Sequence, residues 1–154
     1  MRNILALLAL ILSTPAWADD IPSSELSVGG VMSGATESSV LLTLGEPLQR
    51  VETDEGTDLQ YPGLVVTVGW LEQKAPGVQQ RVLAIRGTGP EACTPRGLCP
   101  GMPASQVSRL YGHSEPVQRE SSTFIEYQPA GISCWLQVSA QAGTVQAVAV
   151  ACQP

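Results

Sequence analysis

Apolar residues recur with the period of an amphipathic helix in two short stretches of the chain, 36–44 and 103–111. Residues three or four positions apart share one side of a helix, and in both stretches that side is apolar. The residues expected on the buried sides are Val40, Leu41, Leu44, Val107, Leu110 and Tyr111. Gly45 and Gly112 directly follow the two stretches, where glycine commonly ends a helix. The pattern therefore predicts two short helices that each stop at a glycine.

Each predicted helix is followed by stretches with the period of two that is typical of β-strands. In the first half these are 48–52, a strand that ends at Tyr61, 64–72 and 79–86. In the second half they are 117–120, a strand that ends at Tyr127, 132–139 and 145–151. One helix followed by several antiparallel strands is typical of an α+β domain. We expect the helices to cover one face of a single shared sheet.

A repeat in the sequence accompanies this order of elements. Gly34, Val40 and Gly45 return at one constant spacing as Gly101, Val107 and Gly112. Tyr61 returns as Tyr127, one position short of that spacing, and Gly69-Trp70-Leu71 returns as Cys134-Trp135-Leu136, two positions short of it. A fixed period with small slips indicates two copies of one supersecondary unit. The sequence thus predicts a single domain over 19–154, built from tandem repeats at about 31–87 and 99–152.

Residues 1–18 have the pattern of a secretory signal peptide. Arg2 precedes an apolar run over 4–12, and Ala16-Trp17-Ala18 supplies small residues at the positions that signal peptidase reads. The run is shorter than the roughly 20 residues that span a bilayer, and the alternative is a buried N-terminal helix. No cysteine lies near the cleavage site to carry a lipid. We expect a periplasmic or secreted chain that starts at Asp19 and has no stable membrane anchor.

The charge of the chain bears on its partners. It carries 14 acidic and 8 basic side chains, a formal net charge of −6, and loss of Arg2 with the leader makes this −7. The basic residues are scattered singly, whereas a nucleic-acid-binding surface groups them, so we expect no nucleic acid as partner. An acidic surface attracts a basic protein partner, or simply keeps the protein soluble.

All four cysteines, Cys93, Cys99, Cys134 and Cys152, lie in the second half of the chain. In an oxidising compartment an even number favours two disulfides. Metal binding is the alternative, but it needs ligands closer together than 5, 34 and 17 intervening residues. In a hairpin that turns around 142–144, Cys134 stands opposite Cys152 on one sheet face. That pairing leaves Cys93 to close a small loop with Cys99, and we expect no metal.

The pattern Gly-x5-Val-x4-Gly-x-Pro over 34–47, with a related pattern over 101–116, precedes strands that carry tyrosine and a Trp-Leu pair. Two such units in an exported chain resemble the superfamily of the β-lactamase-inhibitor proteins and the outer-membrane assembly lipoprotein BamE (SmpA/OmlA). The resemblance implies a saddle-shaped sheet whose open face engages other proteins. The second unit departs from the pattern by extra residues between Gly112 and Pro116. No inhibitor contact residue carries over position by position.

The alternation within 134–139 indicates which residues an open face would carry. Cys134, Leu136 and Val138 form the apolar set, which includes the expected disulfide and so should face the helices. Trp135 then points to the opposite face, across from small alanines of the paired strand. An exposed aromatic ring on a strand is a typical anchor for a protein partner.

The first half has a corresponding set of candidates. Trp70 aligns with Trp135, and Arg86 lies on its expected face. We predict that Trp135, Trp70 and Arg86 bind the partner. The alternative for the first half is that Trp70 lies on the core side of the sheet, because Val66 and Val68 share its alternation.

Sequence motifs of catalysis are missing. A Ser-His-Asp or Cys-His arrangement would have to use His113, the single histidine, which lies in a Gly-His-Ser turn. The acid pairs Asp54-Glu55 and Asp19-Asp20 lie in loop or terminal sequence. We expect no enzyme activity and no cofactor. The favoured hypothesis is an inhibitor or immunity protein that blocks an exported enzyme; the alternatives are a cell-envelope assembly protein and a small-ligand binder.

Overall fold

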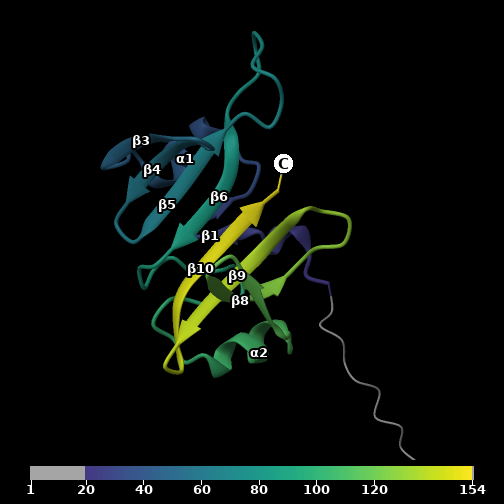
Figure 1. Cartoon of the computed structure of the whole chain (residues 1–154). Coiled ribbons are helices and arrows are strands. Elements are labelled where there is room, and N and C mark those ends of the chain that lie inside the picture. Colours follow the sequence, from purple (N-terminus) through teal and green to yellow (C-terminus); the bar gives the residue numbers. More distant parts are fainter. Residues whose placement is uncertain (1–19, 154) are drawn as a thin grey trace, which may run out of the picture.

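The computed structural model describes residues 20–153, so the expected signal peptide and its cleavage site lie outside the described residues. One antiparallel sheet of eight strands forms most of the fold, together with two α-helices and a small hairpin (Figure 1). The strands of the large sheet are β3 (Gln49–Thr53), β4 (Gly56–Tyr61), β5 (Leu64–Gly69), β6 (Arg81–Gly87), β7 (Pro116–Arg119), β8 (Ser122–Tyr127), β9 (Cys134–Gln141) and β10 (Thr144–Cys152). The other elements are η1 (Ser23–Glu25), β1 (Ser27–Val28), β2 (Val31–Met32), α1 (Glu37–Leu44) and α2 (Ser105–Tyr111).

The strand order of the large sheet is β3-β4-β5-β6-β10-β9-β8-β7, and every neighbouring pair is antiparallel. The first four strands form one half of the sheet and the last four form the other (Figure 1). β6 and β10 meet at the centre, where Arg86 lies directly opposite Ala149. Backbone hydrogen bonds between these two strands therefore join the halves into one sheet.

Capping residues set the limits of both helices. The hydroxyl of Thr36 accepts a hydrogen bond from the N–H of Ser39 at 3.2 Å, which satisfies a free donor in the first turn of α1. Gly45 and Gly112 follow α1 and α2 with φ angles of 80° and 83°, a region that glycine enters without steric cost. Both helices end where the sequence predicts.

Some boundaries differ from those expected. The strand predicted at 64–72 ends already at Gly69, and the strand predicted at 79–86 begins only at Arg81. The loop between them, which carries the turn sequence around Pro76, is therefore longer than expected. The second helix begins at Ser105, not at Pro103, because Pro103 instead forms an isolated bridge with Thr144. All predicted elements are present in the predicted order, and the structure adds η1 and the β1–β2 hairpin, which the sequence did not predict.

The core lies on one face of the sheet. Its strand residues alternate along each strand except at one bulge in β6 and one in β10. Among them are Leu64, Val66, Val68, Val82, Ile85, Leu136, Val138, Val148 and Val150. Val40 of α1 and both Val107 and Tyr111 of α2 belong to the same buried cluster, so both helices cover the same face. Leu41, Leu44 and Leu110, all expected to be buried, are only half-buried. Full burial of one valine or leucine contributes about 1.5–3 kcal/mol, so this single face carries most of the apolar driving force.

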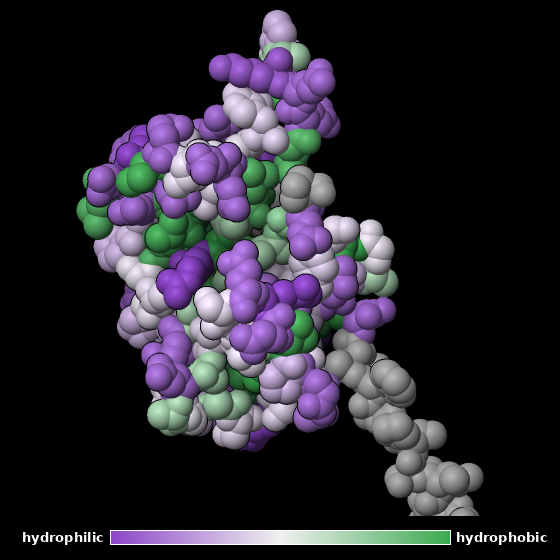
Figure 2. Space-filling model, in the orientation of Figure 1, coloured by the Kyte–Doolittle hydropathy of each residue, from purple (hydrophilic) through white to green (hydrophobic). Residues whose placement is uncertain are grey.

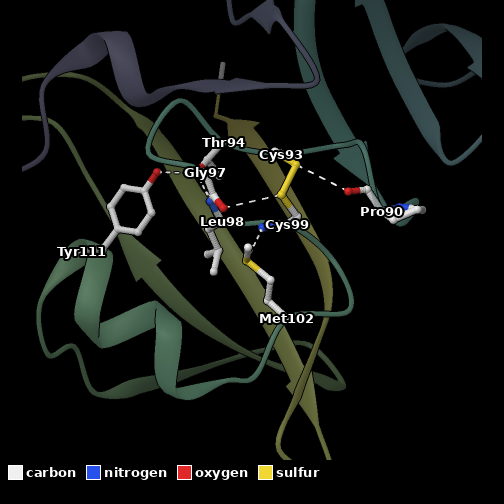
Figure 3. Close-up of a disulfide and its surroundings, with 8 residues drawn as sticks. All are labelled: Pro90, Cys93, Thr94, Gly97, Leu98, Cys99, Met102 and Tyr111. Atoms are coloured by element: carbon white, nitrogen blue, oxygen red, sulfur yellow. Dashed lines mark hydrogen bonds between the residues drawn. A yellow bond between two sulfur atoms is a disulfide. The ribbon is translucent and has the colours of Figure 1, made fainter.

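Both predicted disulfides are present, Cys93–Cys99 (Figure 3) and Cys134–Cys152. The register behind the second pair is also confirmed, since Cys134 lies opposite Cys152 and Leu136 lies opposite Val150. The bond therefore ties the end of β10 to the start of β9 on the core side, and the two bonds use all four cysteines.

Candidate protein-binding face

The sheet face opposite the helices carries the residues that alternate with the core, and we call it the open face. Its side chains over the four central strands and β8 include Val65, Thr67, Ala84, Arg86, Phe124, Glu126, Trp135, Gln137, Ser139, Ala147, Ala149 and Ala151. Both helices pack on the other side. The open face is thus the part of the sheet on which a partner has access to a rigid, hydrogen-bonded framework.

Small side chains form the middle of the open face. Ala84 of β6 lies opposite Ala151 of β10, which in turn lies opposite Trp135 of β9. Ala149 and Ala147 continue the row along β10. Of the three alanines expected across the hairpin from Trp135, only Ala151 lies directly opposite it, and its methyl group leaves the indole without a large neighbour on that side.

Trp135 is half-buried and stands next to a charged side chain. The guanidinium of Arg119 lies over its ring, 5.7 Å from the ring centroid. A cation over the face of an indole is attracted by the negative charge of the π-system. The contact therefore restricts the rotamers of Trp135 before any partner arrives.

A carboxylate holds Arg119 in this position. Arg119 donates from Nε and from one terminal nitrogen to the two oxygens of Glu126, at 3.1 and 2.8 Å, and Gln137 Nε2 donates to the same carboxylate at 2.8 Å. The Glu126 side chain is only 6% exposed. Burial acts to raise the pKa of this carboxyl, but the hydrogen bonds from Arg119 and Gln137 outweigh it and the pKa is lowered. Glu126 is therefore ionised at neutral pH and fixes the arginine.

These residues border a shallow hollow of about 670 Å³. Trp135, Arg119 and Gln137 line it from the second half, and Glu55 lines it from the turn between β3 and β4. Because Arg119 is already paired with Glu126, the carboxylates of Glu55 and Glu120 give the hollow an acidic rim. On the side of the molecule shown in Figure 2, hydrophobic residues form small groups separated by hydrophilic ones. Recognition here would rest on single anchors, not on a continuous apolar surface.

Arg86 occupies the centre of the open face. It is exposed, and its neighbours across the strands are Ala149 on one side and Val65 on the other. It has no carboxylate within ion-pair distance among residues 20–153. The structure thus places Arg86 and Trp135 on the same face, as predicted.

Trp70 lies elsewhere, and this corrects the prediction. It follows the end of β5 and, with a 38% exposed side chain, lines a hollow together with Glu37 and Leu41 of α1. The alternation that places Val66 and Val68 in the core carries Trp70 to the helix side as well. Trp135, by contrast, lies inside β9. The two tryptophans therefore occupy different faces, and the alternative considered for Trp70 is the correct one.

Arg119, Glu126 and Gln137 were not singled out by the sequence. The alternation of β8 does contain the signal, because Glu126 lies directly opposite Gln137 on the open face. Arg119 is the last residue before the β7–β8 turn, and Glu126 lies on the strand that follows it. An arginine and an acid on the two strands of a short hairpin are common on protein surfaces, so the pattern alone has little specificity. The burial that makes Glu126 important arises only when β7, β8 and β9 pair.

Other residues offer little chemistry. His113, the only histidine of the sequence, makes an exposed contact of 2.8 Å with Glu115. Within residues 20–153 no three histidine, cysteine or acidic side chains gather as metal ligands. No helix in the described part of the chain is long and apolar enough to cross a membrane.

Comparisons with known proteins give similarity in fold. No family model and no curated protein matches the sequence. An extracellular protein containing an SCP domain, from Bacillus anthracis strain Ames, is similar with a TM-score of 0.52 at 14% identity, over 79% of this chain and 44% of that one. The chain thus spans less than half of that protein.

A second similar structure is a DUF4309-family protein, YjgB, from Bacillus subtilis subsp. subtilis strain 168. Its TM-score is 0.51 at 16% identity, over 77% of this chain and 78% of that one. Likeness at these identities shows a shared fold and nothing of function. Neither protein is described as a β-lactamase inhibitor or a BamE protein, so that resemblance stays a prediction.

Proposed function

We propose that this protein is an exported protein-binding module, an inhibitor or immunity protein that blocks an exported enzyme through the open face. The observation that carries the proposal is Trp135, held by Arg119 on a rigid strand beside a floor of alanines. Tryptophan and arginine dominate the binding energy of many protein interfaces, because they offer large contact area at small entropic cost. Small residues beside such an anchor leave room for a loop of the partner.

The two disulfide bonds support export of the protein. Disulfides persist in oxidising compartments and are rare in the cytosol. All four cysteines are paired, in the arrangement that the sequence predicts for an exported chain. The paired cysteines therefore favour the signal-peptide interpretation of residues 1–18.

We also propose that the two halves are tandem copies of one unit. The tyrosine that ends the second strand of each half donates a hydrogen bond to the carbonyl of the glycine that ends its helix: Tyr61 to Gly45 at 3.0 Å, and Tyr127 to Gly112 at 2.7 Å. Unrelated segments have no reason to form the same contact between the same elements. The shared contact supports the interpretation of the near-constant spacing of these glycines and tyrosines as a repeat.

The last strand of each half gives further support. Isolated bridges join Thr36 to Arg81 and Pro103 to Thr144, each between the helix entrance and the start of that strand. A β-bulge follows two residues later in both halves, leaving Leu83 and Gln146 unpaired in the register. A bulge inserts one residue at a defined place and bends the strand, so its recurrence favours a duplicated backbone.

The test is affinity capture from periplasmic extract with the disulfide-bonded mature protein. Recovery of one stoichiometric hydrolase whose activity falls on binding is the expected result. Recovery of outer-membrane assembly machinery instead would favour the envelope-assembly alternative and overturn the inhibitor proposal.

The captured partner then tests the open face. Trp135→Ala should weaken binding by about 2 kcal/mol, roughly 30-fold in Kd, while the protein stays folded. Trp70→Ala is the matched control, because it removes an exposed indole from the opposite side. Equal losses for both variants, or normal binding by Trp135→Ala, would show that the open face is not the interface.

A further inference from the structure

A second hollow of about 550 Å³ lies in the first half, away from the open face. Its lining includes Leu44 at the end of α1, Tyr61 and Leu64 on either side of the β4–β5 turn, Gly29, Glu91 and Ala92. Volumes of this size hold small organic ligands. The lining is mainly apolar, with one carboxylate at Glu91.

The corresponding place in the second half is filled by the chain itself. Tyr111 packs against Tyr127 with ring centroids 5.2 Å apart, and Arg96 lies over the Tyr111 ring at 5.0 Å. The Tyr111 hydroxyl lies 2.8 Å from a carboxylate oxygen of Glu25 and 2.6 Å from the hydroxyl of Thr94. Figure 3 shows this hydroxyl directed at the loop closed by the Cys93–Cys99 disulfide. Burial raises the pKa of Tyr111, so the phenol is neutral at physiological pH.

The residues that fill the second half have smaller counterparts in the first. Leu44 precedes Gly45 as Tyr111 precedes Gly112. Extended to the segments that precede the two repeats, the spacing between those two glycines also relates Gly29 to Arg96 and Glu25 to Ala92. In space, Glu25 contacts Tyr111 of the second half, whereas Ala92 lines the hollow of the first. Leu44, Gly29 and Ala92 all line the hollow. The aromatic ring, the cation and the carboxylate of the second half are thus all replaced by smaller side chains, and the space they vacate stays open beside Tyr61.

The backbone at Gly29 favours an open site. Its φ of +60° is one that side chains rarely adopt, and a Cβ there would lie 3.1 Å from Leu64. A side chain in the place of Arg96 is therefore disfavoured in the first half. Glu91 remains at the rim, next to Ala92, and has no basic partner within residues 20–153.

We propose that this hollow binds a small aromatic molecule that carries a positively charged amine. The ring takes the place of the Tyr111 ring and packs on Tyr61, and the amine takes the place of the Arg96 guanidinium and pairs with Glu91. The inference rests on the proposed correspondence of the two halves and is independent of binding at the open face. Failure here would leave the Trp135 experiment intact, because the two sites share no residue.

Tyramine is the probe, since it joins a phenol ring to an ammonium group. In a titration followed by 15N–1H NMR, tyramine should shift the amides of Gly63 and Ala92, while those of Gly112 and Leu136 in the second half stay in place. Two controls carry half of the probe each: p-cresol has the ring alone and propylamine has the amine alone. Both should bind at least about ten-fold more weakly, because each lacks one of the two contacts.

Two variants test the assignment of the contacts. Leu44→Tyr should supply the missing ring, abolish tyramine binding and leave the melting temperature equal or higher. Glu91→Gln should weaken tyramine about ten-fold and leave p-cresol unchanged, whereas Glu72→Gln in the exposed β5–β6 loop should change neither. Normal tyramine binding by folded Leu44→Tyr, no response of the wild type at millimolar tyramine, or equal binding of tyramine and p-cresol would each overturn the proposal.

Discussion

In the second half of the sheet, α2 buries Val107 and Tyr111 against the core, whereas α1 in the first half buries only Val40. The first half also exposes Leu42 and Leu48, by 90% and 77%, while both disulfides lie in the second half. The order of helix and strands is nevertheless the same. The comparison teaches that the same order of elements is supported in two ways: by a buried tyrosine and two disulfides in the second half, and by exposed polar contacts such as the ion pair of Arg50 with Glu37 in the first.

The open face shows the same asymmetry. Glu126 directly precedes Tyr127, and the residue that directly precedes Tyr61 is the uncharged Gln60. The arginine of the neighbouring strand, Arg50, pairs with Glu37 of α1 instead. The charged network that holds the indole therefore exists only in the second half. A binding residue is more effective when its rotamer is fixed in advance, because less entropy is lost on association. The candidate anchor lies on the braced half, where its support is strongest.

The largest expected effect comes from making the second half resemble the first. Tyr111→Leu removes a ring that is 4% exposed and leaves the Glu25 carboxylate without its phenol donor. Glu25 keeps its ion pair with Arg96 at 3.4 Å, so the cost comes mainly from the lost packing of the ring and from one lost hydrogen bond. Together these should cost about 3–5 kcal/mol, measured by chemical denaturation.

The matched control keeps the ring. Tyr111→Phe removes only the hydroxyl and should cost about 1–3 kcal/mol, the range for a buried hydrogen bond to a charged group. If Tyr111→Leu proved no more destabilising than Tyr111→Phe, the ring would contribute nothing to bracing, and the contrast between the halves would fail.

The disulfides give the next effect. The sequence separation is 18 for Cys134 and Cys152 and 6 for Cys93 and Cys99. The entropy that a crosslink removes from the unfolded chain grows with loop length, so the Cys134→Ala/Cys152→Ala variant should lose about 3 kcal/mol and the Cys93→Ala/Cys99→Ala variant about 2 kcal/mol. Urea unfolding of the two variants at equal pH measures both. A larger loss from the smaller loop would mean that the 93–99 segment, through Thr94 and its bond to Tyr111, braces the half in the folded state instead.

Local signals made much of this fold predictable. Gly45 and Gly112 ended the helices because glycine alone accepts the backbone that follows each last turn without strain. Strict alternation over 134–139 fixed the faces of Leu136 and Trp135, and with them the register and the Cys134–Cys152 bond. Each of these features is set within one helix end or one hairpin.

Trp70 shows where such reasoning stops. The bulges place Val66 and Val138 at matching positions, and likewise Val82 and Val145. Val66 and Val138 lie farther apart in the sequence than Gly45 and Gly112 do, so the second half has a longer loop before β9. Val82 and Val145 lie closer together than those glycines, so the second half has a shorter loop after β9. Changes in loop length cost little free energy, so both loops can differ between the halves without disturbing the strands. Because of these two loop changes, Trp70 and Trp135 do not occupy equivalent positions, although their spacing is close to that of the repeat.

The smallest effect concerns the charged network on the open face. The folded-state pKa of Glu126 is lowered, so its ion pair stabilises the fold at pH values above the unfolded pKa of about 4.3. This contribution is lost as pH falls through the lower folded-state value, because the carboxylate must then bind a proton. Glu126→Gln should therefore cost about 1 kcal/mol at pH 7, as for a weak charge-assisted hydrogen bond, and less near pH 3.

Denaturant unfolding at both pH values tests this, with Gln60→Ala as the control in the first half. Since Gln60 has no ionisable side chain, that variant should show the same cost at both pH values. A Glu126→Gln cost that stayed constant with pH would mean that Arg119 and Gln137 orient Trp135 without help from the charge of Glu126.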